Sequence, residues 1–349
     1  MQPINTALLS FGMSGVVFHA PLIHVHPGFR FYAVWERTKN LAQEKYEGVK
    51  TYRSLEELLS DPKVELVVVN TPNYTHYEYT EKALLAGKHV VVEKPFTVTA
   101  DEAHKLIALA RRQNKCLSVY HNRRYDSDYK TVKKILDQDL LGEIVEAEFH
   151  FDRYNQSLSP KVHKEIPGPG RGALYDLGSH LVDQALQLFG MPQAVFADIQ
   201  IIRPHSKVDD YFEVLLYYPG QRVRLRCSYL VKEPIPGYII HGTQGSFIKH
   251  KTDVQEKALQ AGLLPDKESW GIEPAHEKGL LHTVVDGTEI KEYVSSERGN
   301  YLDYYEGMYQ SIRNHKAVPV LPEEALDVIR IIEAAFQSSR EKKVVALTA

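Results

Sequence analysis

Cysteine is scarce in this sequence, with only Cys116 and Cys227 among 349 residues. Two thiols are too few for a disulfide framework or a cysteine-rich zinc site, and such scarcity is typical of a reducing compartment. Long apolar runs are missing too, because no stretch approaches the roughly 20 residues that span a bilayer. The first residues, MQPINTALLSFGMSG, have no basic segment before their short apolar run, unlike a secretory signal peptide. We therefore expect a cytoplasmic protein.

The sequence also lacks a strong excess of charge of either sign. Its 42 Lys and Arg residues nearly balance 45 Asp and Glu residues, which gives a net charge of −3. No strong field therefore favours nucleic acid or an anionic membrane as a partner, and we expect neither. A content of 43% hydrophobic and 25% charged residues excludes wholesale disorder. At 349 residues the chain exceeds the usual size of a single core, so two domains are expected.

The first expected domain, residues 1–122, alternates short apolar runs with helix-like segments. This alternation predicts βαβ units that build a parallel sheet. Ser54 and Glu57 form a capping-box pattern at the start of one helix. The predicted strands are INTALLSF, FRFYAVWE, VELVVVN, KHVVVE and KCLSVY, and the predicted helices include residues 54–60, 75–86 and 101–113.

The second expected domain, residues 123–349, has a different pattern of apolar and polar residues and is predicted to be α+β. A polar helix at 127–138 precedes long stretches in which apolar and polar residues alternate, as in antiparallel strands. The segment IPGPG at 166–170 is either a surface loop near a cleft or a mere connector. The alternating stretches are EIVEAEFHFDRY, AVFADIQIIRP, YFEVLLYY and RVRLRCSYL, and the chain ends with a predicted helix at 323–339 and a short strand at 344–347.

The first predicted strand runs into SFGMSG at residues 10–15 and then into an apolar helix that begins near Val16. This is the pattern of a dinucleotide-binding turn with serine at the first glycine position. Gly12 would let the backbone approach a pyrophosphate, Gly15 would let helix and strand pack closely, and the helix N-terminus would bind the anion. Ser10 places a side chain where glycine is favoured. The alternative is a plain strand-to-helix turn.

The second strand ends at Glu36 and Arg37, about 21 residues after Gly15, where an adenosine ribose would lie. Glu36 is suited to accept hydrogen bonds from a ribose 2′-hydroxyl, which favours NAD, whereas Arg37 is suited to hold the 2′-phosphate of NADP. Both charges are otherwise explained as a solvated turn. The sequence slightly favours NADP over NAD.

Two further strands end in polar motifs, Asn70-Thr71-Pro72-Asn73 and Glu93-Lys94-Pro95. Open α/β sheets bind ligands at the carboxyl ends of their strands. Lys94 is a candidate donor to a ribose hydroxyl or a reacting oxygen, and the bond before Pro95 is a candidate cis peptide. An exposed lysine at a strand end is the alternative.

Asp176 and His180 stand four residues apart in LYDLGSHLVDQALQLFG, whose apolar spacing is helical, so both are expected on one helix face. Histidine is suited to take a proton near neutral pH, and a neighbouring carboxylate can orient the ring or a substrate hydroxyl. A capping aspartate with a structural histidine is the alternative. We expect no metal, because the chain shows no compact third and fourth ligand.

Two more residues are candidate substrate contacts. Arg123 lies in HNRRYD, where the chain passes into the second domain and polar groups would line an interdomain cleft. Arginine–aspartate pairing at a polar junction is equally compatible with that segment. Tyr154 lies in Asp152-Arg153-Tyr154, which ends a predicted strand just before the loop at 166–170.

Together these residues resemble the glucose-fructose oxidoreductase / inositol dehydrogenase / MocA (Gfo/Idh/MocA) family over essentially the full length. The motifs that carry the resemblance are the turn at 10–15, Thr71-Pro72-Asn73 with His76, Glu93-Lys94-Pro95, and Asp176 with His180. Within the family, FHAPL, SVYHNRR, LYDLGSHLVDQ and HGTQGSFIKH look like the branch of NADP-dependent scyllo-inositol dehydrogenase.

The resemblance implies a Rossmann domain, then an α+β domain with an open, mostly antiparallel sheet, a nicotinamide dinucleotide, and homo-oligomers, dimers or tetramers, that pair through the sheet's outer face. It also implies that Lys94, Asp176 and His180 are catalytic. The residues expected to bind the cofactor are Gly12, Met13, Ser14, Gly15, Glu36, Arg37, Thr71, Pro72, Asn73, His76, Glu93 and Lys94, and those expected to contact substrate are Arg123, Tyr154, Asp176 and His180.

The resemblance implies hydride transfer between a secondary alcohol of a cyclic polyol or sugar and NADP or NAD, and the chemistry of these residues agrees with it. His180 would remove the hydroxyl proton, Asp176 would orient the hydroxyl or imidazole, and Lys94 would steady the developing negative charge on oxygen. Two other functions stay open: a dinucleotide-binding sensor without turnover, and an NAD-dependent glycosidase of the same family.

Overall fold

The computed structural model describes residues 2–347, which fold into two compact units. Unit 1 comprises the chain up to Tyr125 together with residues 253–270 and 300–326, and unit 2 comprises residues 126–252, 271–299 and the chain from Asp327 onward. Unit 1 therefore takes in two segments that lie far along the chain from its parallel strands. No helix among the described residues is long and apolar enough to cross a membrane.

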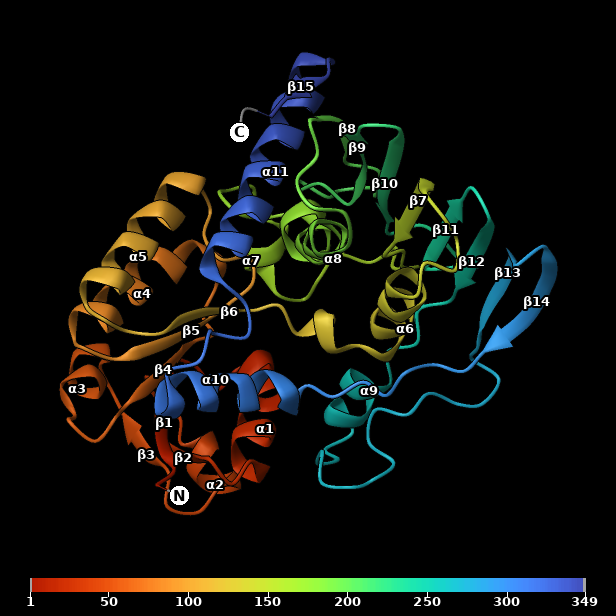
Figure 1. Cartoon of the computed structure of the whole chain (residues 1–349). Coiled ribbons are helices and arrows are strands. Elements are labelled where there is room, and N and C mark those ends of the chain that lie inside the picture. The colour runs from red at the N-terminus through yellow and green to blue at the C-terminus, as the bar shows by residue number, and fades with distance from the viewer. Residues whose placement is uncertain (1, 348–349) are drawn as a thin grey trace. The chain divides into compact units, whose positions relative to one another are not determined.

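Unit 1 is built on sheet A, whose strands within the described residues follow the order β3-β2-β1-β4-β5-β6 (Figure 1). All neighbouring pairs are parallel, and this is the order of a doubly wound dinucleotide-binding fold. This order confirms the predicted fold class of the first domain. Strands such as β4 are apolar and fully buried, as expected in a parallel sheet. The strands are β1 (Ile4–Leu8), β2 (Phe29–Trp35), β3 (Lys50–Tyr52), β4 (Leu66–Val69), β5 (His89–Glu93) and β6 (Leu117–Tyr120).

Helices α3, α4 and α5 of unit 1 begin within one residue of the predicted starts at 54, 75 and 101, whereas α9 and α10 were not predicted. The Ser54 hydroxyl accepts from the Glu57 amide in the predicted capping box, and Thr99 and Glu102 repeat that motif. The short β3 and α2 were not predicted, because neither has an apolar run of its own. The helices are α1 (Ala20–Val25), α2 (Leu41–Lys45), α3 (Leu55–Ser60), α4 (His76–Leu85), α5 (Ala100–Arg112), α9 (Val254–Gln260) and α10 (Leu302–Asn314).

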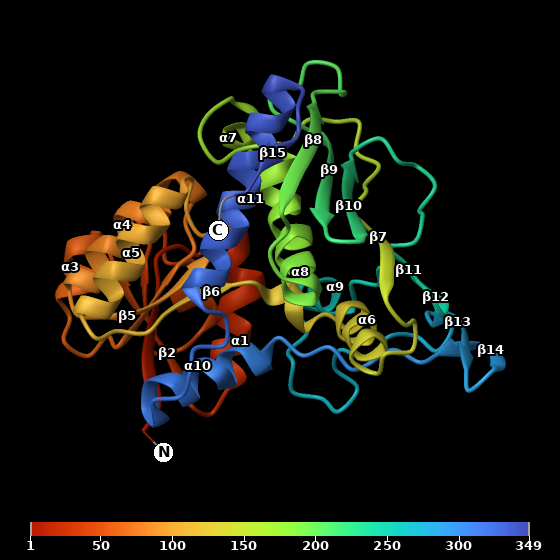
Figure 2. The same ribbon diagram turned by 45° about the horizontal axis from the view of Figure 1, so that its top comes forward.

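Unit 2 is built on sheet B, with the order β14-β13-β12-β11-β7-β10-β9-β8-β15 among the residues described. The pairs are antiparallel except β7 with β10, so the prediction of an open, mostly antiparallel sheet is confirmed. Helix α8 runs along one face of β8–β10 (Figure 2). The elements are α6 (Ser127–Asp137), β7 (Ile144–His150), α7 (Val162–Glu165), α8 (Ser179–Phe189), β8 (Ala194–Gln200), β9 (Tyr211–Tyr218), β10 (Gln221–Ser228), β11 (Tyr238–Gly242), β12 (Gly245–Lys249), β13 (Gly279–Val285), β14 (Thr288–Val294), α11 (Pro322–Glu341), which begins in unit 1, and β15 (Val345–Ala346).

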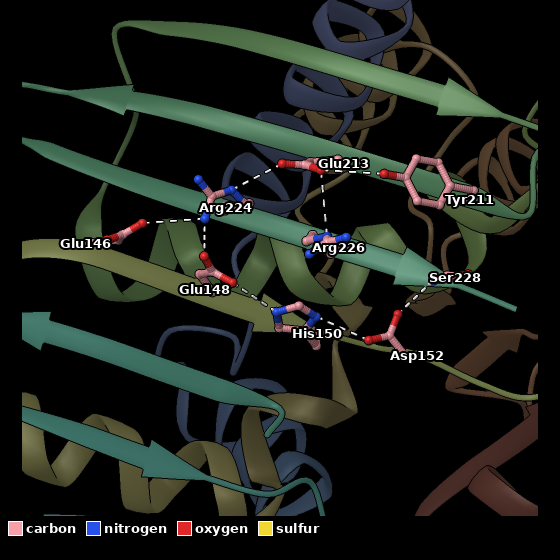
Figure 3. A network of polar contacts seen from close by, with 9 residues as sticks. All are labelled: Glu146, Glu148, His150, Asp152, Tyr211, Glu213, Arg224, Arg226 and Ser228. Atoms are coloured by element: carbon pink, nitrogen blue, oxygen red, sulfur yellow. Dashed lines mark hydrogen bonds and ion pairs between the residues drawn. The ribbon is translucent and has the colours of Figure 1, made fainter. Parts of the chain in front are cut away.

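The other face of sheet B carries a network of charged side chains (Figure 3). Arg224 lies at its centre, with Nε 3.1 Å from Glu213 Oε1 and Nη1 paired with Glu146 and Glu148. The buried ring of His150 continues the network from Glu148 to Asp152. Along β9, buried and half-buried residues alternate regularly. Successive side chains of a strand point to opposite faces, so one face of the sheet is buried and the other is half-exposed.

Candidate functional site

The turn after β1 has the close packing and the open front that a dinucleotide requires. A Cβ atom on Gly15 would lie 2.5 Å from the carbonyl oxygen of Ser10, so only glycine lets strand and helix approach this closely. A Cβ atom on Gly12 would meet nothing nearer than the Ser10 hydroxyl at 3.8 Å. The exposed Gly12 and Met13 therefore leave the front of the turn accessible. These residues fit a bound nicotinamide dinucleotide.

Ser10 is accommodated by a reciprocal set of hydrogen bonds with Asn70 at the end of β4. The Ser10 amide donates to Asn70 Oδ1 at 3.0 Å, and its hydroxyl donates to the Asn70 carbonyl at 2.9 Å. In return, Asn70 Nδ2 donates to the Ser10 carbonyl at 2.9 Å. Serine at the first glycine position thus joins two strand ends.

The chain after the turn does not enter an α-helix at once. Residues Gly15–His19 form a π-helical turn, and α1 starts only at Ala20, followed by Pro21 in its first turn. The sequence therefore predicted correctly that a helical segment follows the turn, but its first turn is π-helical and not α-helical. The π-helical turn buries His19 completely.

Glu36 and Arg37 have opposite environments. Both carboxylate oxygens of Glu36 accept hydrogen bonds from the backbone at the start of α2, from Leu41 and Ala42 at 3.1 Å each. Glu36 is buried, whereas Arg37 and Lys39 are exposed. The sequence did not reveal this capping role, because α2 itself was not predicted. The ribose contact of Glu36 stays a prediction.

The ends of β4 and β5 are braced by His76. Its Nδ1 lies 2.8 Å from the Pro95 carbonyl and its Nε2 lies 3.0 Å from the Thr71 carbonyl. Burial lowers the pKa of His76, so the neutral ring donates to one of these carbonyls. The bond between Lys94 and Pro95 is cis. His76 thus holds together the two motifs that the sequence singled out.

Glu93 is the polar centre of this region. Its Oε1 accepts from the Ser14 hydroxyl at 2.5 Å and lies 3.0 Å from His19 Nε2, and its Oε2 accepts from the Lys94 amide at 3.2 Å. Burial by itself raises the pKa of Glu93, but the hydrogen bonds from His19 and Ser14 and the charges of His19 and Lys94 outweigh it and lower the pKa to about 2. Glu93 is therefore a carboxylate across the physiological range.

The depressed pKa of Glu93 predicts a pH-dependent contribution to stability. A carboxyl group that is more acidic when folded stabilises the fold above its unfolded pKa, here 4.5, and loses that contribution as the pH falls toward about 2. With its side chain only 13% exposed, Glu93 should contribute about 3 kcal/mol at pH 6. We expect Glu93→Gln to lower the urea-unfolding free energy by about this amount at pH 6 and by less at pH 3. The exposed Glu78→Gln variant is the control, and a Glu93→Gln deficit that does not shrink at pH 3 would contradict the assignment.

Asp176 and His180 lie on one continuous helical segment of unit 2. Residues Leu174–Gly178 form a π-helical turn that leads into α8, whereas the sequence predicted a helix without indicating a π-helical turn. Asp176 is partly exposed and pairs with Lys164 Nζ at 2.9 Å. His180 is 5% exposed, and its ring centroid lies 6.2 Å from that of Phe151.

Asp209, which the sequence analysis did not single out, anchors the start of this segment. Its Oδ2 accepts from the Leu174 amide at 2.8 Å, and its carbonyl accepts from the Ala173 amide at 2.8 Å. Gly172 has a φ of +97°, and a Cβ atom there would lie 1.8 Å from Asp209 Oδ1. Burial raises the pKa of Asp209 to about 6, despite the amide hydrogen bonds. Glycine is therefore required at the entry to the segment that carries Asp176.

The two other predicted substrate contacts differ in environment. Arg123 is buried in unit 1, where its guanidinium pairs with Asp253 at 2.7 Å and with Glu256, both at the start of α9. This ion pairing is the alternative that the sequence left open, and a substrate contact of Arg123 stays a prediction. Tyr154 is 47% exposed in unit 2, and its hydroxyl accepts from Gln156 Nε2 at 2.8 Å.

The structure brings the expected cofactor set together in unit 1, at the carboxyl ends of β1, β2, β4 and β5. Lys94 belongs to this unit, whereas Asp176, His180 and Tyr154 belong to unit 2. Among residues 2–347, no group of three or more His, Cys, Asp or Glu side chains is arranged to hold a metal ion.

Comparison with known proteins identifies the family of the chain. Two models of one oxidoreductase family match the chain, the NAD-binding Rossmann fold over residues 4–121 and the C-terminal alpha/beta domain over residues 133–347. The chain is 40% identical to scyllo-inositol 2-dehydrogenase (NADP(+)) IolW of Bacillus subtilis, over 99% of this chain and 97% of that protein. It is 36% identical to the uncharacterized oxidoreductase YdgJ of Escherichia coli, over 99% of each chain. The crystal structure of an oxidoreductase from Bacillus cereus superimposes with a TM-score of 0.92 at 34% identity, covering 99% of each chain.

Proposed function

Because this chain belongs to the Gfo/Idh/MocA family of NAD(P)-dependent oxidoreductases, we propose that it transfers hydride between a secondary alcohol of a cyclic polyol, such as an inositol, and NADP. The observation that carries the proposal is the open turn at Gly12 and Gly15, joined through Glu93 to Lys94 in one unit. The full-length similarity to an NADP-dependent inositol dehydrogenase supports the substrate class.

The proposed preference for NADP rests on the hydrogen bonds of Glu36 and the exposure of Arg37. Both oxygens of Glu36 already accept backbone hydrogen bonds, so binding a ribose 2′-hydroxyl would compete with the cap of α2. Arg37 is exposed, and a guanidinium pairs well with a phosphate. The 2′-phosphate of NADP therefore matches this strand end better than the 2′-hydroxyl of NAD.

We assign the chemical roles to three side chains. His180 takes the hydroxyl proton of the alcohol, since imidazole is the base best matched to neutral pH. Asp176 orients that hydroxyl, and the Lys94 ammonium stabilises the negative charge that develops on its oxygen. The nicotinamide, when bound, supplies the hydride acceptor.

A substrate panel tests the proposal. We expect purified protein to reduce NADP with at least one inositol isomer, and faster than it reduces NAD, as followed by absorbance of the reduced nicotinamide. Aldoses, acyclic polyols and model glycosides complete the panel. Sugar release without net reduction would identify a glycosidase instead, and cofactor binding without turnover of any compound would contradict both activities.

We also propose that two copies of the chain pair through the half-exposed face of sheet B. On that face the charged network of Figure 3 lies beside apolar side chains of β8 and β9 such as Phe196, Leu215 and Tyr217. Acidic and basic groups are interspersed, so the face is complementary to a second copy of itself.

The pairing predicts a change of mass in solution. Wild-type protein should elute as a dimer or tetramer in size-exclusion chromatography with light scattering, and Leu215→Asp should shift it toward the monomer because it buries an unpaired charge. Leu263→Asp, on an exposed loop of unit 1, is the control. A monomeric wild type, or a Leu215→Asp protein of unchanged mass, would refute the pairing.

A further inference from the structure

His19 is a buried side chain next to the candidate cofactor turn. The chemistry assigned above gives this side chain no role. It lies in the FHAPL segment, at the end of the π-helical turn that follows Gly15. Its side chain has no exposure to solvent, although an imidazole in a purely apolar core costs free energy unless its nitrogens are satisfied. Both nitrogens have partners, and those partners point to a role.

The ring of His19 joins three segments that are far apart in the sequence. Its Nε2 lies 3.0 Å from Glu93 Oε1, and its Nδ1 lies 2.7 Å from the hydroxyl of Tyr305 on α10. The ring also packs against Tyr120, with 4.6 Å between the centroids. Because the Glu93 carboxylate only accepts hydrogen bonds, Nε2 must carry the proton that the two share.

The Glu93 carboxylate, held by His19, also bonds both parts of the candidate cofactor site, the turn at Ser14 and the strand end at Lys94. The oxygen that faces His19 also accepts from Ser14 in the turn, and the other oxygen accepts from the Lys94 amide. A carboxylate with donors on both oxygens has one orientation in which all of them are satisfied. Removal of the His19 donor would release that orientation.

We propose that His19 is a positioning residue: by donating to Glu93 it fixes the Lys94 backbone relative to the Ser14 turn, and so aims the Lys94 ammonium at the reacting oxygen. The inference deepens the proposed function and rests on it for the role of Lys94. The hydrogen bond with the Tyr305 hydroxyl holds the ring from its other side and does not reach Glu93. The two contacts of His19 therefore have different consequences, and single substitutions can separate them.

His19→Gln and His19→Asn are the matched pair. The longer glutamine places its amide N–H near the position of Nε2 and keeps a donor for Glu93, whereas the shorter asparagine reaches the position of Nδ1 and keeps a partner for Tyr305. Both remove the ring, so both have a similar cost in packing. The packing costs should therefore be alike, and His19→Asn should melt at the lower temperature, because it alone loses the donor to the buried Glu93 carboxylate.

The first readout needs no substrate. Trace acetylation with N-acetoxysuccinimide, followed by peptide mass spectrometry, gives the reactivity of Lys94 relative to the exposed Lys82 in the same chain. We expect the relative rate in His19→Gln to stay within about twofold of wild type. In His19→Asn it should rise by about threefold or more, because the Lys94 segment is no longer held by the Glu93 carboxylate and its side chain becomes more accessible to the reagent.

The second readout separates positioning from stability. In His19→Asn, kcat should fall by about tenfold or more while the dissociation constant of NADPH, measured by its fluorescence, changes by less than about threefold. His19→Gln should keep kcat within about threefold of wild type. Equal Lys94 reactivity in the two variants would overturn the proposal, as would equal kcat.

A third variant covers the case in which neither substitution of His19 folds. Glu93→Gln has the size of the native side chain and offers only one acceptor oxygen, so it should raise the Lys94 acetylation rate in the same direction. An unchanged Lys94 rate in Glu93→Gln would refute the proposal. If no alcohol is oxidised, the proposed function fails separately, since the acetylation rates are measured without substrate.

Discussion

The His180→Ala variant is expected to lose about 100- to 10,000-fold in kcat while binding NADPH as the wild type does. The imidazole is the assigned base for the hydroxyl proton, and general-base catalysis typically contributes a factor of this size. His180 is not among the residues assigned to the cofactor, so the cofactor contacts should be unaffected. Steady-state rates and an NADPH fluorescence titration measure the two quantities.

His276→Ala is the matched control for this prediction, because His276 is an exposed histidine of the same unit. It should retain wild-type turnover. Added imidazole should restore part of the activity of His180→Ala, because it supplies the missing base from solution. Near-normal turnover in His180→Ala would remove His180 from the catalytic role.

The second large effect is expected at Arg37. Replacement by glutamine should lower kcat/KM for NADP by about 10- to 100-fold, because a charge-assisted pair with the 2′-phosphate is lost. The kcat/KM for NAD should stay within about twofold, since NAD carries no such phosphate. Kinetics with each cofactor at a fixed concentration of the best alcohol give both values.

The control for Arg37→Gln is Arg112→Gln, which removes an exposed arginine at the end of α5. It should leave both cofactors unaffected. A wild-type preference for NAD would contradict the account, because Glu36 would then have to serve the ribose instead of capping α2. Equal losses for both cofactors in Arg37→Gln would show that the side chain stabilises the strand end and does not read the phosphate.

The sequence predicted the parallel sheet well because buried strands such as β4 and β5 are continuous apolar runs. It did not predict β3 or α2, which have three and five residues, since segments this short carry no measurable period. The inclusion of residues 300–326 in unit 1 was also hidden, because their contacts with the first 125 residues have no local signature.

The candidate site divides in a similar way. Gly12, Gly15 and Lys94 were singled out by motif spacing, which depends on neighbours in the sequence, and their roles stay predictions. The long-range hydrogen bonds around them were not predicted: Asn70 bonds Ser10 across 60 residues, and Tyr305 bonds His19 across 286. Residue type and spacing therefore locate a chemical group, whereas its orientation is set by contacts that only the folded chain displays.

Hydride transfer is the central claim, and isotope transfer is its most direct test. The alcohol with the highest rate in the panel, deuterated at the carbon that bears its reacting hydroxyl, is incubated with NADP and the protein, and the reduced cofactor is analysed by mass spectrometry. Hydride transfer should place one deuterium on the nicotinamide ring for each alcohol oxidised. Reduced cofactor without deuterium, or deuterium lost to water, would contradict it.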